Sequence, residues 1–368
     1  MKFIVIGAVI LIFAFVWFCG LPFWRYDSYI QNLKPVAHRK LPIHFDEKNQ
    51  EYIITNQSGG NFKILQLTDI HLACSFTTQK RDKKAIQAVY DLAAATKPDF
   101  IVITGDFAYP IPIQTLSVSN LNPAVTLCKL MKQIGIPWCL TYGNHDTEML
   151  STHPDKSLNS IFQQESSCLF HPDSTVETGR CNQVIRVKNF DGTINQLLVL
   201  LDSNSYASMK HSSYDYIHDD QVKWYEKKVN QASQEDDHIV SSLIFMHIPP
   251  QEFKEACRLY QQDSPLVEYQ FGVLGERNGK VACSSAPSRL FSRAVHLRST
   301  KAIFVGHDHL NYISLKYKGI QLTFSRSIDY LAYLGIAKKT EQRGGTVIVL
   351  KPDSSIETHS IKLADIQK

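Results

Sequence analysis

Apolar and polar positions alternate along the chain in blocks that predict strands and helices in turn. Continuous apolar runs at residues 62–68, 100–104 and 137–141 predict buried strands. Between them, residues 80–96 and 123–134 carry the apolar spacing of amphipathic helices. Strands that alternate with helices in this way are typical of βαβ units, so we expect an α/β fold.

The rest of the chain is predicted to contain more strands than helices. Residues 147–182 form a long polar insertion with weak helical character near residues 158–164, and residues 251–277 are predicted to be polar and irregular. We expect one main domain over residues 62–363. The remaining patterns predict strands at residues 183–188, 196–201, 238–246, 302–305, 312–317, 320–324, 345–350 and 356–361, and helices at residues 219–231 and 287–297.

The amino-terminal end differs in composition from the rest. Residues 3–18 carry no charge, and the apolar stretch continues to Trp24, so it is long enough to cross a bilayer as a helix of about 20 residues. No cleavage site of small residues comes after it, so we expect residues 1–26 to form a membrane anchor rather than a cleaved export signal. Residues 27–61 are predicted to be a connector with a short hairpin.

Positive charges on both sides of the apolar segment leave its orientation open. Lys2 favours a cytoplasmic amino terminus, whereas Arg25, Lys34 and Arg39 favour the opposite orientation. Because amino-terminal apolar segments more often export the domain attached to them, we expect a single-pass protein with an extracytoplasmic main domain, or an exported protein.

Net charge and cysteine content add little to the expected fold and partners. The 368 residues carry a net charge of +4 without a dense run of lysine and arginine, so we expect no nucleic-acid partner. Cys168 and Cys181 bracket a loop and are the pair that we expect to form a disulfide, with Cys257 and Cys283 as the second candidate pair.

Five short polar motifs come after apolar runs in a fixed order. Ligands bind at the carboxyl ends of strands in open α/β sheets, so we expect five loops at one sheet edge to converge on a single site. Each motif alone is more often structural than functional, but five of them in order at strand ends are not explained by structure alone. The motifs are Asp69-Ile70-His71, Gly105-Asp106, Gly143-Asn144-His145-Asp146, Met246-His247 and Gly306-His307-Asp308-His309.

These motifs supply carboxylates, imidazoles and one amide oxygen, which suit manganese, iron or zinc. Their number is sufficient for two metal ions that share one carboxylate. Two metal ions about 3.5–4 Å apart are a common device for displacement at phosphorus. The glycines that precede Asp106, Asn144 and His307 allow sharp turns close to a metal ion.

The order of the motifs resembles that of the calcineurin-like metallophosphoesterases over residues 62–350. A closer resemblance is to the short purple-acid-phosphatase-like branch of that superfamily. It implies a four-layer αββα sandwich with two mixed β-sheets, with residues 62–363 as the catalytic domain. The segments that support the closer resemblance are Tyr214-Asp215-Tyr216-Ile217-His218, Trp224-Tyr225, Met246-His247-Ile248-Pro249-Pro250, Gly275-Glu276, Val281-Ala282-Cys283-Ser284 and Gly306-His307-Asp308-His309-Leu310-Asn311.

The resemblance also implies a ligand set for two divalent or trivalent metal ions. Asp106 would bridge the two ions. The remaining ligands would be Asp69, His71 and His309 for the first ion, and Asn144, His247 and His307 for the second. The metal identity stays open among manganese, iron and zinc.

The implied reaction is hydrolysis of a phosphomonoester by a metal-bound hydroxide. His145 would act as the general acid at the leaving-group oxygen. The substrate would be a phosphorylated small molecule or a phosphoprotein. A phosphodiesterase that uses the same site is the alternative enzyme, and a non-catalytic binding module on this fold is the alternative outside the enzymes.

Tyr109 and Asp146 are the expected supporting residues. True purple acid phosphatases place an iron-binding tyrosine where Tyr109 stands, but they lack a histidine at the position of His71. Calcineurin-type enzymes place at this position an aspartate that supports the catalytic histidine. Tyr109 is therefore an iron ligand, a partner of His145 or a packing residue, and Asp146 is expected to orient its neighbours.

Overall fold

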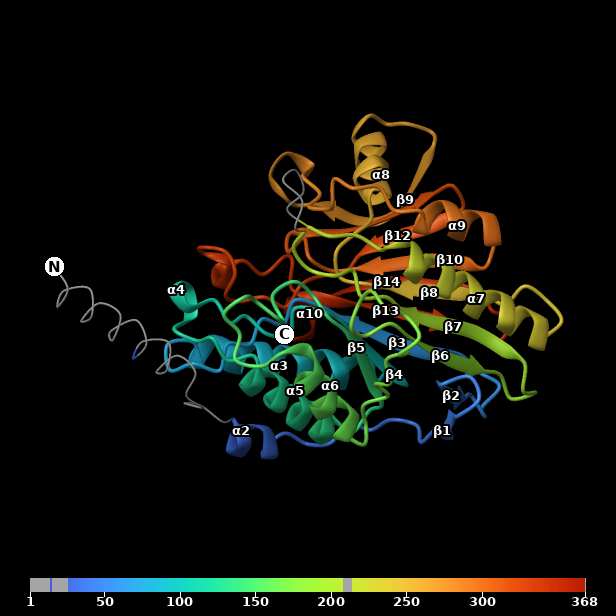
Figure 1. The fold of residues 1–368 in the computed structure, drawn as a ribbon. Helices are drawn as coiled ribbons and strands as arrows, with labels where there is room; N and C mark the ends of the chain where they lie inside the picture. Colours follow the sequence, from blue (N-terminus) through green and yellow to red (C-terminus); the bar gives the residue numbers. More distant parts are fainter. Residues whose placement is uncertain (1–13, 15–25, 208–213, 368) are drawn as a thin grey trace.

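The computed structural model describes residue 14, residues 26–207 and residues 214–367 (Figure 1). The predicted amino-terminal anchor, residues 1–26, falls almost entirely outside the described residues. Within the described part of the chain, no helix is both long and apolar enough to cross a membrane.

The smaller of the two sheets contains the first three strands that the sequence predicts. Its strand order is β14-β13-β3-β4-β5, and β3, β4 and β5 run parallel while β13 and β14 run antiparallel to their neighbours. All five residues of β4 are buried, in agreement with its continuous apolar sequence. The strands are β3 (Phe62–Leu67), β4 (Phe100–Thr104), β5 (Trp138–Thr141), β13 (Gly344–Leu350) and β14 (Ile356–Lys362).

The larger sheet has nine strands in the order β1-β2-β6-β7-β8-β10-β12-β11-β9. Its centre is parallel, because β8 pairs in parallel with β7 and with β10. The strands are β1 (Ile43–Asp46), β2 (Glu51–Thr55), β6 (Gln183–Lys188), β7 (Ile194–Leu200), β8 (Ser242–Phe245), β9 (Val267–Leu274), β10 (Thr300–Val305), β11 (Asn311–Tyr317) and β12 (Ile320–Phe324).

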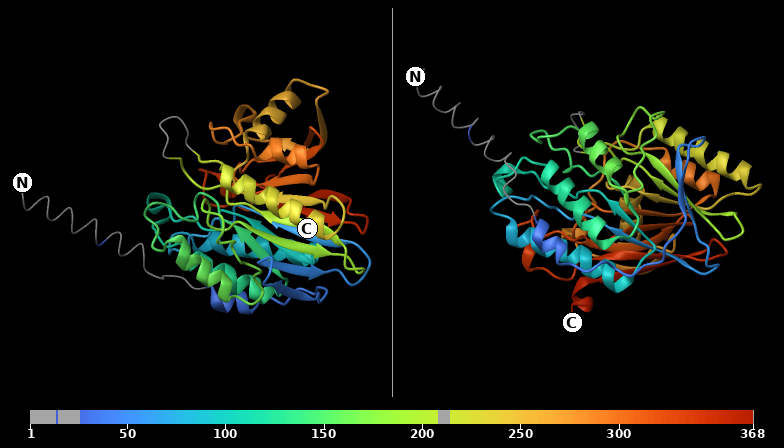
Figure 2. Two further views of the ribbon diagram at one scale, coloured as in Figure 1. Left: turned by 45° about the vertical axis from the view of Figure 1, so that its right-hand side comes forward. Right: turned by 90° about the horizontal axis from the view of Figure 1, so that it is seen from below.

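The two sheets pack face to face and helices cover their outer faces (Figure 1 and Figure 2). Alternate side chains of both sheets form the central apolar layer. A second apolar layer joins the smaller sheet to α2, α3, α5 and α6, and a third joins the larger sheet to α7, α8 and α9. The helices are α2 (Asp27–Gln31), α3 (Gln79–Thr96), α4 (Pro112–Thr115), α5 (Leu121–Ile134), α6 (Asp155–Gln164), α7 (Asp219–Glu235), α8 (Gln251–Gln261), α9 (Leu290–Leu297) and α10 (Leu363–Ile366).

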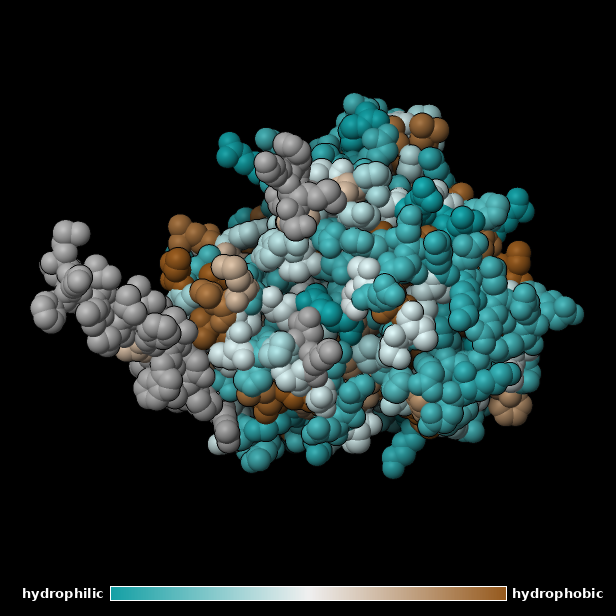
Figure 3. All heavy atoms as spheres, in the orientation of Figure 1, coloured by the Kyte–Doolittle hydropathy of each residue, from teal (hydrophilic) through white to brown (hydrophobic). Residues whose placement is uncertain are grey.

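This arrangement confirms the predicted four-layer α/β sandwich with two mixed sheets. Hydrogen bonds between the layers fix how the sheets lie on each other. The side chain of Gln66 in β3 donates to the carbonyl oxygen of Val305 in β10 at 3.2 Å. The molecular face in Figure 3 is mostly hydrophilic, and one of its groups of hydrophobic residues lies beside α4, where Ile113 is 93% exposed.

One segment differs from its prediction. Residues 251–277 are not irregular, because they contain α8 and β9, which pairs with β11 as the edge strand of the larger sheet. The predicted short hairpin is present as β1 and β2, and β2 pairs in parallel with β6, so the hairpin extends the larger sheet.

The predicted disulfides are wrong. Every cysteine in the described part of the chain is a free thiol. The sulfur of Cys181 lies 3.2 Å from the hydroxyl oxygen of Thr141 and accepts a hydrogen bond from the backbone N–H of Tyr142. Cys168 and Cys257 are likewise buried, in the apolar layers on either side of the molecule. Burial as small apolar side chains explains these positions without a covalent bond.

Candidate metal centre

The five sequence motifs lie at the carboxyl ends of strands, but the strands belong to both sheets. β3, β4 and β5 of the smaller sheet lead into the first three motifs, and β8 and β10 of the larger sheet lead into the last two. The expectation of a single sheet edge is therefore wrong. The loops still converge, because the strand ends meet across the sandwich, where the Nδ1 of His247 lies 2.8 Å from the carbonyl oxygen of Thr104.

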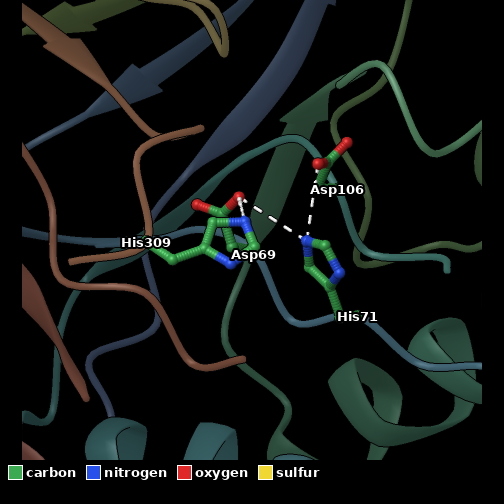
Figure 4. A group of neighbouring side chains, drawn as sticks. All are labelled: Asp69, His71, Asp106 and His309. Atoms are coloured by element: carbon green, nitrogen blue, oxygen red, sulfur yellow. Dashed lines mark ion pairs between the residues drawn. The ribbon is translucent and has the colours of Figure 1, made fainter. Parts of the chain in front are cut away.

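Four side chains form the first group of possible metal ligands: Asp69, His71, Asp106 and His309. Figure 4 shows them pointing toward one another; Asp69 and His71 come from the loop after β3, Asp106 from the loop after β4, and His309 from the loop after β10. One ligand atom from each lies within 4.8 Å of the others, and all four residues are buried. The Nε2 of His309 lies 3.2 Å from Asp69 Oδ1, and the Nε2 of His71 lies 3.4 Å from Asp106 Oδ2.

Asp106, His247 and His307 form the second group, so Asp106 belongs to both. The Nε2 of His247 lies 3.2 Å from Asp106 Oδ2. Asn144 contributes a buried amide oxygen, while its amide nitrogen donates to the hydroxyl of Tyr206 at 3.0 Å. The structure thus brings all seven predicted ligand residues into two groups or beside them.

Unsatisfied polar atoms test whether these residues suit metal ions. Buried polar groups in proteins almost always have a hydrogen-bond partner. Two atoms each about 2.1 Å from one ion lie about 3.0–3.4 Å apart, close to the separations given above. Six ligand atoms are buried without a hydrogen-bond partner: Asp69 Oδ1, His71 Nε2, Asp106 Oδ2, Asn144 Oδ1, His247 Nε2 and His307 Nε2. The set fits two cations that share Asp106.

The backbone at the ligands is strained. Asp69, His71 and Asp106 have φ values of 52°, 53° and 53°, in the left-handed region that side chains with a Cβ rarely adopt. Such strain concentrates at functional sites, where the surrounding structure holds it in place. Gly143 allows a close approach to a candidate ligand, because a Cβ at this position would lie 2.1 Å from Asp106 Oδ1. These features agree with the predicted sharp turns around the metal ions.

Charges within the second group shift each other's pKa. Burial opposes ionisation of Asp106, but His247 outweighs it and holds the pKa of this carboxyl well below its usual range. Burial likewise opposes the charged form of His247, yet Asp106 raises the pKa of the imidazole to about 9. Burial and the charge of His247 lower the pKa of His307 to about 3. The site therefore favours positive charge beside its carboxylates.

Asp146 supports the backbone of the loops, as expected. Its carboxylate accepts hydrogen bonds from the backbone N–H groups of Asp106, Ala108 and Gly143 at 2.8–2.9 Å. Burial and the nearby Asp106 raise the pKa of Asp146 to about 7. The two neighbouring loops are thus tied together by a residue that is not a member of either ligand group.

Asp329 is a site residue that the sequence motifs do not contain. Its Oδ2 lies 2.9 Å from the Nδ1 of His309, and its Oδ1 lies 4.0 Å from the Nδ1 of His71. Burial opposes the charged form of His71, but Asp329 raises the pKa of this imidazole to about 9. The only signal in the sequence was an aspartate shortly after the strand at residues 320–324.

His145 lies beside the first group and has two neighbours of interest. Its Nδ1 lies 2.6 Å from Oε1 of Glu148, a residue outside the five sequence motifs. The ring of Tyr109 packs against His145 and His71, with centroid distances of 4.8 and 4.7 Å. The hydroxyl of Tyr109 donates to Gln114 at 3.0 Å. Of the three expected roles for Tyr109, this geometry favours packing.

Comparisons with known proteins agree with this geometry. A model of the calcineurin-like phosphoesterases matches residues 62–311. The protein named "Probable inactive purple acid phosphatase 29" of Arabidopsis thaliana is 25% identical, over 84% of this chain and 85% of its own. Phosphatase DCR2 of Saccharomyces cerevisiae is 26% identical, over 70% of this chain and 45% of its own. Among solved structures, a dimetal phosphatase from Danio rerio aligns over 81% of this chain and 98% of that chain, with 12% identity and a TM-score of 0.48.

Proposed function

Because the chain belongs to the calcineurin-like phosphoesterase family, we propose that it is an active hydrolase of phosphomonoesters with a centre of two metal ions. The observation that carries the proposal is the set of six buried ligand atoms without hydrogen-bond partners. Burying such atoms costs free energy unless a bound group interacts with them. Metal cations bind carboxylate oxygens, imidazole nitrogens and amide oxygens at one site.

Different side chains would bind the metal ions and donate the proton in this reaction. Asp106 would hold both ions, with Asp69, His71 and His309 on one side and Asn144, His247 and His307 on the other. Two ions bound there would supply Lewis acidity for the phosphoryl oxygens and for the attacking water. His145 would donate a proton to the leaving-group oxygen. Manganese, iron or zinc would suit these ligands, and the substrate would be a phosphorylated small molecule or a phosphoprotein.

The names of some relatives bear on activity. Three Arabidopsis thaliana relatives, which are 23–27% identical, are named "probable inactive" purple acid phosphatases. Loss of metal ligands is the simplest physical route to inactivity in this fold. All seven ligand residues and His145 are present here, which supports an active enzyme.

Hydrolysis of two aryl esters tests the proposal. The purified chain is incubated with p-nitrophenyl phosphate or bis-p-nitrophenyl phosphate, with Mn²⁺, Fe²⁺, Zn²⁺ or EDTA. We expect metal-dependent release from the monoester and a fall of about 10²–10³-fold or more in Asp106→Asn, since several kcal/mol of charge stabilisation is lost. The control is Asp353→Asn, at an exposed turn. Activity that survives both EDTA and Asp106→Asn would contradict the metal centre, and faster diester hydrolysis would contradict the monoesterase assignment.

We also propose that residues 1–26 tether the protein to a membrane with the catalytic domain on the extracytoplasmic side. The uncharged apolar sequence of residues 3–18 supports this. Protease added to intact cells is expected to digest the catalytic domain. A protected domain that becomes sensitive only after lysis would overturn the proposed orientation.

A further inference from the structure

We propose that Glu148 is the positioning residue of His145, an inference that rests on the proposed hydrolysis of phosphate esters. The Oε1 of Glu148 lies 2.6 Å from the Nδ1 of His145, and both side chains are largely buried, with exposed fractions of 17% and 21%. A carboxylate only accepts hydrogen bonds, so the Nδ1 of His145 carries the proton in this contact. The Nε2 is then the ring nitrogen that remains available to a substrate.

No other described contact fixes the rotation of the His145 ring in the same way. Tyr109 stands where the resemblance would place a supporting carboxylate, but its hydroxyl donates to Gln114. The rings of Tyr109 and His71 pack edgewise on His145, with centroid distances of 4.8 and 5.5 Å. Ring packing restricts the plane of the imidazole. The hydrogen bond to Glu148 turns Nδ1 toward the carboxylate and leaves Nε2 available to the substrate.

Glu148 also connects His145 with the metal ligand Asn144. The same Oε1 accepts a hydrogen bond from the hydroxyl of Tyr206 at 2.9 Å. That hydroxyl in turn accepts from the amide nitrogen of Asn144 at 3.0 Å. Because the amide nitrogen is held by Tyr206, the amide oxygen of Asn144 is left for the second ligand group. One carboxylate therefore orients the proposed acid and steadies a neighbouring ligand.

The loop that carries Glu148 is anchored in the core. Asn120 is fully buried, and its amide nitrogen donates to the carbonyl oxygens of Asp146 and His153 at 3.0 and 2.9 Å. The backbone N–H of Ser151 donates to the carbonyl oxygen of Glu148 at 2.8 Å. A positioning side chain must itself be held by its surroundings, and these bonds hold the backbone on both sides of Glu148.

Hydrolysis of an ester with a poor leaving group requires a proton at the leaving-group oxygen, and a misoriented His145 would deliver it poorly. Water forms a new bond to phosphorus and gives one proton to solvent as the bond from phosphorus to the ester oxygen breaks. The ester oxygen takes the Nε2 proton of the doubly protonated His145 ring and leaves as an alcohol. The ring keeps its Nδ1 proton on the hydrogen bond to Glu148, and solvent returns a proton to Nε2. Leaving groups that are stable as anions need this proton little, whereas poor leaving groups depend on it.

Kinetics with two leaving groups test the inference. In Glu148→Ala we expect kcat for phenyl phosphate to fall about 10–10²-fold with KM almost unchanged. For 2,4-dinitrophenyl phosphate we expect a change of less than about threefold. Glu148→Gln is expected to recover most of the loss, because its amide oxygen still accepts from Nδ1. Glu177→Ala, an exposed change in the same insertion, is the matched control. Equal losses on both esters, or no loss on either, would overturn the positioning role.

A second measurement does not depend on activity. In the metal-free protein labelled with ¹⁵N-histidine, NMR at a pH where His145 is neutral reports which ring nitrogen carries the proton, with the signal assigned by comparison with His145→Asn. We expect the Nδ1–H tautomer in the wild type and a shift toward Nε2–H in Glu148→Ala. The same tautomer in both proteins would overturn the inference even if the enzyme is active. An inactive wild type with the expected tautomer shift would instead contradict only the proposed function.

Discussion

Asp329 and Glu148 each contact the Nδ1 atom of a histidine, His309 and His145 respectively. Neither carboxylate belongs to one of the five sequence motifs. The carboxylate of Asp329 bonds to His309, and the backbone N–H groups of Leu331 and Ala332 donate to it at 2.6 and 3.0 Å. Burial opposes ionisation of Asp329, but the charges of His71 and His309 lower its pKa to about 2. Asp329 is therefore an anion that fixes the Nδ1 side of His309 and leaves Nε2 for a metal ion.

Replacement of Asp329 by alanine tests this role at the residue scale. We expect the affinity for Mn²⁺ or Zn²⁺ to fall about 10–100-fold, because such supporting partners orient a ligand and raise its basicity. Competition with a fluorescent chelator measures the affinity, and circular dichroism checks that the variant folds. Asp191→Ala, at an exposed turn, is the control. An unchanged affinity in folded Asp329→Ala would show that His309 needs no support.

The sequence predicts which candidate ligands gather in the two groups, but it does not predict the residues that support them. Candidate ligands such as Asp69 and His307 occur at fixed short spacings after strands, so their types and order single them out. The partner of His309 is 20 residues away in sequence, and only the fold brings it near. The role of Tyr109 depends on where its hydroxyl points, which Gln114 decides. No pattern of residue types contains that information.

At the scale of elements, buried segments were predictable and edge segments were not. The continuous apolar sequence of β4 allows only a buried strand, and its predicted bounds, residues 100–104, match those in the structure. β9 does not stand out in the sequence because it is an edge strand without a buried side chain and with a glycine at position 272, so it lacks an apolar run. The buried residues of α8 are Phe253, Ala256, Cys257 and Leu259, and the residues between them are mostly polar. The apolar spacing of this helix is therefore hard to recognise in the sequence.

The long insertion at residues 147–182 is joined to α7 through Asp173. The carboxylate of Asp173 accepts from the indole N–H of Trp224 at 2.9 Å and lies 3.2 Å from the ammonium of Lys228. Burial opposes its ionisation, but these donors and Thr175 lower the pKa of Asp173 to about 2. The folded-state pKa lies below the unfolded value of about 4. The contribution of this contact to stability is therefore present above about pH 4 and is lost as the pH falls toward 2.

This contact gives a prediction with a defined pH dependence. We expect Asp173→Ala to lower the free energy of unfolding by about 1 kcal/mol at pH 7, a value reduced for solvent screening. The difference from the wild type should shrink as the pH falls from 4 to 2. Urea unfolding at several pH values measures both, with Glu177→Ala as the control in the same insertion. A difference that stays constant down to pH 2 would mean that the ionised carboxylate contributes nothing.

At the scale of the whole molecule, the metal centre joins the two sheets. Asp69 and Asp106 come from loops of the smaller sheet, whereas His247 and His309 come from loops of the larger one. The oxygen atoms of Asp69 and Asp106 that face the centre are buried and have no hydrogen-bond partner, and imidazole nitrogens lie 3.2–3.4 Å from them. Buried charge without hydrogen bonds destabilises a fold, so cations bound here would remove part of that cost.

Metal binding should therefore stabilise the whole fold. At a free metal concentration 100 times the Kd, the gain is about 2.7 kcal/mol. For a chain of this size we expect Mn²⁺ or Zn²⁺ to raise Tm by roughly 5 °C and EDTA to reverse the rise. Asp106→Asn should abolish the rise. Its metal-free Tm should fall below that of the wild type, because His71 and His247 lose the buried carboxylate beside them. Differential scanning calorimetry measures each value. A rise in Tm that survives in Asp106→Asn would contradict stabilisation through this centre.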